Sequence, residues 1–106
     1  MIRVNVETLR DSSVRLKRFY LGKPYESIYF TAREASCMWH FLNNKTIIEA
    51  AAALQLSPRT VEFYANNMKT KLSCYSKAEL VKRVLKSEFI HNYLQTEESE
   101  RLGNQE

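Results

Sequence analysis

The spacing of apolar and polar residues changes near residue 30, which predicts a strand-like segment followed by helices. Residues 2–9 alternate apolar and polar side chains, as a half-buried strand does. A second strand-like run spans residues 14–21 and ends at the turn-forming sequence Gly22-Lys23-Pro24. We therefore expect residues 1–29 to be a short strand-like extension, with a β-hairpin as one arrangement.

Capping signals divide the rest of the chain into helices. In a capping box, a hydroxyl side chain accepts from the backbone N–H three residues later, and the glutamate there accepts from the backbone N–H of the hydroxyl residue. Ser57 followed by Pro58 is a different start signal, because the first residue of a helix needs no N–H donor. The box spacing occurs at Thr31 with Glu34, at Thr46 with Glu49 and at Ser76 with Glu79. These starts predict a mainly α fold, a four-helix bundle over residues 30–87.

The second and third predicted helices are joined only by Gln55-Leu56-Ser57, which is typical of a helix-turn-helix. The small side chains of residues 50–53 allow the third helix, residues 58–72, to cross close to the second. At 100° per residue, one face of the third helix is predicted to point to the core; it comprises Val61, Tyr64, Ala65, Met68 and Leu72. The opposite face carries Arg59, Glu62, Phe63, Asn66, Lys69 and Thr70.

This opposite face has the chemistry of a surface that reads DNA bases. Amides and carboxylates hydrogen-bond to base edges in the major groove, and an apolar side chain contacts thymine methyl groups. The nearby cations Lys45, Arg59, Lys69 and Lys71 are candidates for contacts to phosphates. Phe63 could instead fill a protein interface, and Glu62 could be a solvated charge or a partner of Arg59.

Charge supports a polyanionic partner for the body of the chain. The chain has 16 Lys+Arg and 12 Asp+Glu, a net charge of +4. Residues 30–87 contain nine basic and four acidic side chains, whereas residues 88–106 contain one and five. The basic charge therefore lies in the body, and the last segment is predicted to be a helix extension followed by an acidic flexible tail.

Other function classes find little support in the sequence. No Ser/His/Asp set, glycine-rich phosphate loop or metal-ligand spacing is present, so we expect no enzyme, cofactor or metal site. Cys37 and Cys74 are expected to be buried small apolar residues, as in a reducing, cytoplasmic compartment. The apolar stretch Ile47–Leu54 is too short to cross a membrane.

The sequence resembles the LuxR-type (GerE, NarL/FixJ) C-terminal helix-turn-helix domain of bacterial transcription regulators. The resemblance covers residues 30–85, and its most specific parts are FTARE, SPRTVE and KLSCYSKAEL. It implies a nucleoid-associated regulator that places the third helix in the major groove of double-stranded DNA, dimerises through the fourth helix and acts on RNA polymerase. By position it assigns base contacts to Glu62, Phe63 and Asn66. The apolar stripe of the fourth helix is expected to be part core and part dimer interface; it comprises Leu80, Val81, Val84 and Leu85.

The resemblance extends the list of expected contacts to the DNA backbone, because it places Thr60, Tyr64, Lys69 and Lys71 at or near it. The full list is Lys45, Thr46, Arg59, Thr60, Tyr64, Lys69 and Lys71. The chain departs from the family at Glu62 and Ile48, where lysines are common, and at Asn44, Gln55 and Ser73, where glycines are common.

Three questions stay open at the level of sequence. Glu62, Ile48 and the apolar Phe63 also fit a helix-turn-helix module that binds a partner regulator instead of DNA. Residues 1–29 either pack on the body, pair with another chain or form the end of a sensor domain. After residue 86, the fourth helix either continues or is followed by a short fifth helix.

Overall fold

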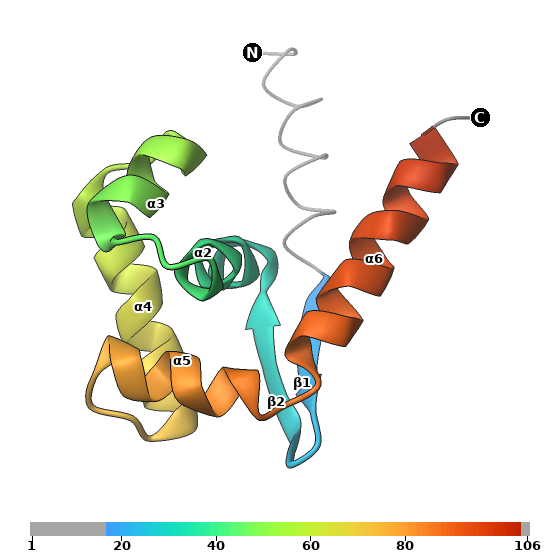
Figure 1. Ribbon diagram of the computed structural model, residues 1–106, viewed down its shortest axis with the longest axis horizontal. Coiled ribbons are helices and arrows are strands. Elements are labelled where there is room, and N and C mark those ends of the chain that lie inside the picture. The colour runs from blue at the N-terminus through green and yellow to red at the C-terminus, as the bar shows by residue number, and fades with distance from the viewer. Residues whose placement is uncertain (1–16, 105–106) are drawn as a thin grey trace, which may run out of the picture.

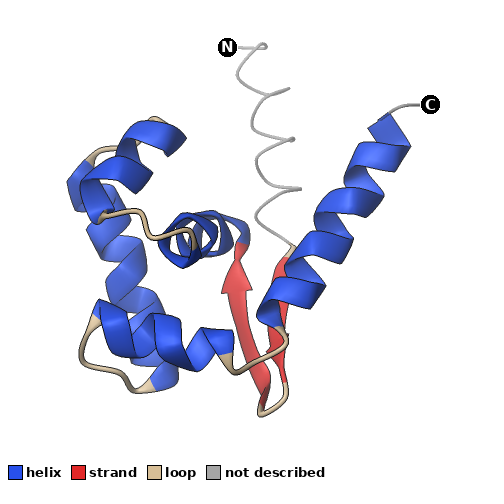
Figure 2. Ribbon diagram, in the orientation of Figure 1, coloured by secondary structure: helices blue, strands red, loops and turns tan. Residues whose placement is uncertain are grey.

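The computed structural model describes residues 17–104, and it describes their side chains as far as Thr96. A two-stranded antiparallel sheet precedes a series of helices (Figures 1 and 2). The elements are β1 (Arg18–Gly22), β2 (Tyr25–Thr31), α2 (Ala32–Leu42), α3 (Ile47–Leu54), α4 (Pro58–Leu72), α5 (Lys77–Leu85) and α6 (Phe89–Asn104). The strand predicted over residues 2–9 lies outside the described residues.

The hairpin differs from the predicted one. Its first strand, β1, covers the end of the run that was expected to be the second strand, and its second strand, β2, follows the turn at residues 22–24. Phe19 lies opposite Phe30, and Tyr20 lies opposite Tyr29. The strand predicted up to residue 21 is confirmed from residue 18 onward, whereas β2 was not predicted. Gly22 has φ +71°, and a Cβ there would collide with the side chain of Glu88, so this turn requires glycine.

The hairpin packs on the helices and belongs to the same core. Phe19 and Leu21 of β1 and Phe30 of β2 are buried. Helix α6 covers them: the ring centroids of Phe30 and Phe89 are 5.4 Å apart, and so are those of Phe19 and Tyr93. Of the alternatives for the N-terminal extension, its described part therefore packs on the body.

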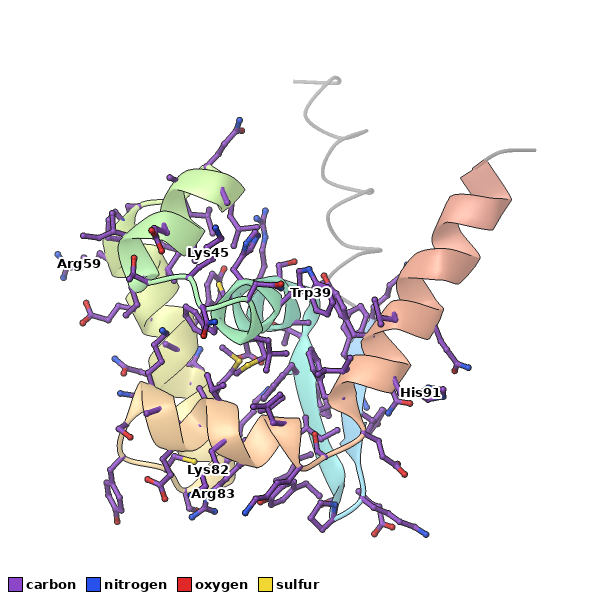
Figure 3. The ribbon with its side chains drawn as sticks, viewed as in Figure 1. Trp39, Lys45, Arg59, Lys82, Arg83 and His91 are labelled. Atoms are coloured by element: carbon purple, nitrogen blue, oxygen red, sulfur yellow. The ribbon has the colours of Figure 1, made fainter. Side chains whose placement is uncertain are left out.

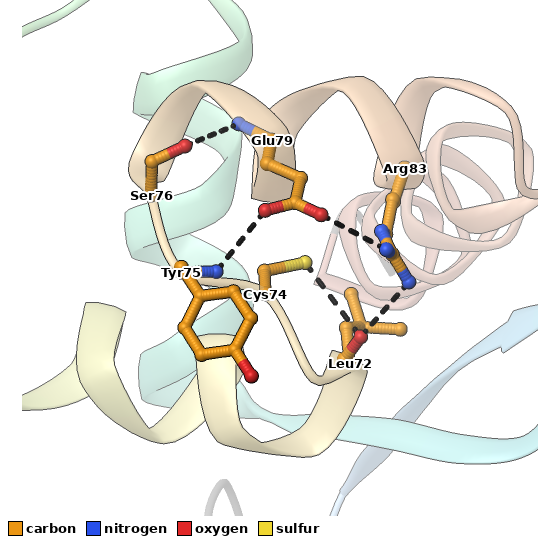
Figure 4. Close-up of polar contacts among 6 residues, drawn as sticks. All are labelled: Leu72, Cys74, Tyr75, Ser76, Glu79 and Arg83. Carbon is orange, nitrogen blue, oxygen red and sulfur yellow. Dashed lines mark hydrogen bonds and ion pairs between the residues drawn. The ribbon is translucent and has the colours of Figure 1, made fainter.

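The predicted helix starts are confirmed at α2, α3 and α4, and the third capping box is only half formed. Thr31 with Glu34 and Thr46 with Glu49 form complete boxes. Ser76 accepts from the backbone N–H of Glu79 at 3.0 Å, but Glu79 does not return the bond to Ser76. Its carboxylate accepts from the backbone N–H of Tyr75 at 3.1 Å instead (Figure 4).

The end of the chain is more helical than the sequence predicts. Helix α5 ends at Leu85 and a separate helix α6 begins at Phe89, which settles the alternative left open after residue 86. The backbone of residues 96–104, predicted as a frayed tail, continues α6. Figure 1 shows this helix extending away from the bundle, on the opposite side of the molecule from α3 and α4.

The positions where the resemblance leads us to expect glycine have left-handed backbone. Asn44, Gln55 and Ser73 have φ values of 65°, 59° and 56°. Each left-handed residue other than glycine costs about 1 kcal/mol, less for asparagine. The helix connections thus use the left-handed conformation that glycine adopts most easily, at some expense in stability.

Candidate nucleic-acid interface

Helix α4 is held with one face in the core and the opposite face outward. Ser57 caps it by accepting from the backbone N–H of Thr60 at 3.1 Å. The buried face is Val61, Ala65, Met68 and Leu72, as the helical spacing predicts. Tyr64 was expected in the core but is only half-buried and lines a surface hollow.

The outward face of α4 leaves its predicted base-reading side chains exposed. Phe63 is 60% exposed, and its ring packs edge-on against Tyr64, with centroids 5.7 Å apart. Glu62 and Asn66 are also exposed. Within residues 17–96, Glu62 forms no ion pair with Arg59 or with any other side chain. The face therefore presents a carboxylate, an amide and an aromatic ring to whatever approaches it.

Most of the predicted phosphate-contacting residues lie on α4 or at the start of α3. Lys45 and Arg59 are exposed, and Figure 3 shows both on the α3–α4 side of the molecule, away from His91 on α6. Lys69 is half-buried on α4. The hydroxyls of Thr46 and Thr60 lie at the first turns of α3 and α4, where Thr46 caps α3 and Thr60 lies 2.9 Å from the Ser57 hydroxyl.

Lys71, predicted to contact a phosphate, has partners inside the fold. Its ammonium donates to the carbonyl of Tyr29 at 2.8 Å and to the carboxylate of Glu34 at 2.7 Å. It also lies 4.8 Å from the centroid of the Tyr29 ring. Since Glu34 is itself buried, Lys71 neutralises a carboxylate of the fold and ties α4 to α2 and β2.

Arg33 is a residue that the sequence interpretation missed. It lines a hollow of about 470 Å³ together with Thr31, Leu56 and Tyr64. The hollow joins the first turn of α2 to the flank of α4, and Arg33 is exposed there. The signal was available in the FTARE sequence, where the arginine follows the capping threonine by two positions.

Helix α5 divides the predicted dimer interface into buried and exposed residues. Leu80 and Val84 have no exposed surface, so they belong to the core and cannot contact a second subunit. Leu85 is 56% exposed and Val81 is half-buried. These two line a groove of about 450 Å³ whose other walls are Phe41, Asn44, Lys77, Ala78 and Lys82.

A polar cluster joins the end of α4 to α5 (Figure 4). Arg83 donates to the carbonyl of Leu72 at 3.1 Å and to the carboxylate of Glu79 at 2.9 Å. The backbone N–H of Tyr75, and next Arg83, lower the pKa of Glu79. The cluster therefore links the orientation of α4 to that of α5.

Both cysteines are buried, as the sequence predicts. Burial raises the pKa of the Cys37 thiol to about 11 and also raises that of Cys74. Among the described residues, no group of three His, Cys, Asp or Glu side chains could hold a metal ion. None of the described helices combines the length and the apolar character needed to span a membrane.

Comparison with known proteins gives one family. Residues 29–84 match the family model GerE, described as bacterial regulatory proteins, luxR family. No curated protein and no solved structure matches the chain. The matched region contains α2, α3, α4 and nearly all of α5, whereas β1 and α6 lie outside it.

Proposed function

Because the chain belongs to the luxR family of bacterial regulatory proteins, a family of DNA-binding transcription regulators, we propose that it reads a specific double-stranded DNA sequence with α4 in the major groove. The observation that carries the proposal is the outward face of α4, where Phe63 is 60% exposed between two polar side chains. An aromatic ring held in water gains from contact with thymine methyl groups. The proposal includes no catalytic step and no cofactor.

Each base-contacting residue has its own task. The carboxylate of Glu62 accepts from the exocyclic amine of cytosine, and the amide of Asn66 suits adenine. Phe63 contacts thymine methyl groups. Glu62 repels phosphates, so it favours binding only where a cytosine faces it, and this makes it a determinant of specificity rather than of affinity.

The phosphate contacts come from residues around the reading face. Their task is to fix the register of α4 on the duplex without reading sequence. Lys71 is not among them, because its ammonium is bound to Glu34 and to the Tyr29 carbonyl. The proposed set is Arg33, Lys45, Thr46, Arg59, Thr60, Tyr64 and Lys69.

We propose that two copies bind together through the groove on α5. The exposed Leu85 and half-buried Val81 supply the apolar contact, and Lys77 and Lys82 lie at its edges. Two α4 helices would then read half-sites about 34 Å apart or a multiple of that. Replacing Leu85 by glutamate should abolish the dimer in sedimentation, and if the dimer persists, the interface lies elsewhere. On promoter DNA, such a dimer would contact or exclude RNA polymerase.

The experiment that tests the reading of bases is selection of bound sites from a random duplex pool. The wild type should enrich one motif, and Asn66→Ala and Glu62→Ala should each relax one position of it, losing about 1–3 kcal/mol of discrimination. Gln95→Ala, which removes an exposed amide from α6, is the matched control and should enrich the unchanged motif. Failure of the wild type to enrich any motif would overturn sequence-specific binding.

A second candidate, a module that binds a partner protein, is favoured by the exposed apolar side chains Ile48 and Phe63. Phe63→Ala separates the two functions. Loss of DNA affinity with this variant supports the DNA reader. Unchanged DNA affinity combined with loss of a co-purifying regulator supports the protein-binding module.

A further inference from the structure

The hairpin has an outer face of cationic and aromatic side chains, although it lies mostly outside the region that matches the family. Phe19, Leu21 and Phe30 alternate with residues that point away from the core. On that outer side Arg18 is exposed and lies 4.8 Å from the centroid of the Tyr29 ring. The outer face therefore presents one exposed guanidinium, which is held beside the side chains of Tyr20 and Tyr29.

This outer face continues onto the flank of the reading helix. The Arg18 guanidinium and the Lys71 ammonium of α4 both lie 4.8 Å from the centroid of the Tyr29 ring. Lys71 follows Tyr64 by seven residues, which places the two side chains about 20° apart around α4. The hairpin is thus attached to the flank of α4 that carries Tyr64.

A second contact joins the same surfaces nearer the middle of α4. Thr31, which pairs with Arg18 across the hairpin, lines the hollow that also holds Arg33 and Tyr64. From β1 to the flank of α4, the surface is therefore formed in turn by Arg18, Thr31, Arg33 and Tyr64. Three elements, β1, the first turn of α2 and the flank of α4, share one continuous side.

The charge along this side is positive. These contacts include one carboxylate, that of Glu34, and the Lys71 ammonium pairs with it at 2.7 Å. Among the residues that the structure describes, neither Arg18 nor Arg33 forms an ion pair. Two guanidiniums therefore remain for an external anion, and guanidinium is well suited to phosphate.

We infer that the hairpin is part of the DNA-binding surface and that Arg18 contacts a backbone phosphate beyond those reached by α4 and its neighbours. The inference rests on the proposed function. It assigns to a segment outside the family match a contact that anchors the flank of α4 on the duplex. Such a contact adds affinity without reading bases.

The test is a salt titration of binding to a random-sequence duplex by the full chain. For Arg18→Gln, log affinity should depend on log salt with a slope shallower by about 0.9, which is about an eightfold loss of affinity at 0.1 M salt. Arg18→Lys keeps the charge and should keep the slope. Lys86→Ala removes an exposed cation from the end of α5 and is the matched control, for which no change in slope is expected.

Each contrary result has its own meaning. Wild-type binding with an unchanged slope in Arg18→Gln overturns the hairpin contact and leaves the proposed function standing. An equal loss in Arg18→Lys, or in Lys86→Ala, also overturns it, because the effect would then come from packing or from net charge. Undetectable wild-type binding at low salt overturns the proposed function itself.

A measurement on the wild type alone covers the case in which a variant melts below the assay temperature. Ethylation interference on the selected site should mark one phosphate per half-site outside the set flanking the major-groove contact. Absence of that outlying phosphate overturns the inference.

Discussion

Phe89 is the residue whose removal best tests whether the hairpin and α6 form one core with the helix-turn-helix. Its side chain has no exposed surface, and its ring lies 5.4 Å from those of Phe30 and Tyr93, measured between centroids. Burial of about 200 Å² of phenyl surface contributes up to about 5 kcal/mol at 25 cal/mol per Å². We therefore expect Phe89→Ala to lower the free energy of unfolding by about 4 kcal/mol.

The assay is urea unfolding followed by circular dichroism and by the fluorescence of Trp39, whose ring stacks on Tyr93 at 5.3 Å. With an m-value of about 1.5 kcal/mol per molar urea, the midpoint should fall by about 2–3 M in a single transition. Leu94→Ala, on the same helix but 46% exposed, is the control and should cost about 1 kcal/mol or less.

Two results would refute the reasoning about Phe89. A loss below about 1 kcal/mol would mean that the helix-turn-helix does not depend on the aromatic layer beneath α6. A separate, earlier change in Trp39 fluorescence with helicity retained would mean that the layer unfolds on its own. Either outcome would also remove the support that holds Arg18 beside the proposed DNA-binding surface.

Three further predictions follow from the caps, the turns and the thiols. Cys37, with its pKa raised to about 11, and the buried Cys74 should react with a thiol reagent at pH 8 only on unfolding; stoichiometric labelling of native protein would contradict their burial. The pKa values of Glu49 and Glu79 are lowered from 4.5, first by backbone N–H bonds, so the stability they contribute above that pH is lost as pH falls through the lower folded-state values. Melting temperatures of the glutamine variants should accordingly fall less steeply below pH 4.5 than that of the wild type, and parallel curves would exclude the linkage. Gln55→Gly should raise the free energy of unfolding by about 0.5–1 kcal/mol in urea titrations, because φ is 59° there. A free energy of unfolding below that of the wild type would show that packing of the Gln55 side chain stabilises the fold.

The parts of the fold that the sequence predicts are those determined locally. The starts of α2, α3 and α4 depend on hydrogen bonds between residues three positions apart, which can be recognised in any sequence. Strand β2 was missed because its pairing with β1 comes from tertiary contact, and its burial pattern does not alternate cleanly. Beyond Leu94, α6 has almost no apolar spacing, so the sequence pattern gave no reason to expect a helix there.

The same division applies to the candidate site. Helical geometry alone places Phe63 and Asn66 outward, because their direction follows from the buried face of α4. The partners of Lys71, Tyr29 and Glu34, are 42 and 37 residues away in sequence. No local pattern could therefore show that its ammonium is paired within the fold. An apolar stripe likewise does not tell a core residue such as Val84 from a surface one.

The net charge of the body therefore overstates the charge available to DNA. Lys71, Lys77 and Arg83 each donate to a backbone carbonyl of the fold, and two of them also bind carboxylates. The cations that remain around the reading face are Arg33, Lys45, Arg59 and Lys69. If each neutralises one phosphate, the salt slope per protomer is about −3.6, and the contact from Arg18 makes it about −4.5. A slope of about −7.2, which adding Lys71, Lys77 and Arg83 to these five contacts would give, would mean that these three side chains leave their partners on binding.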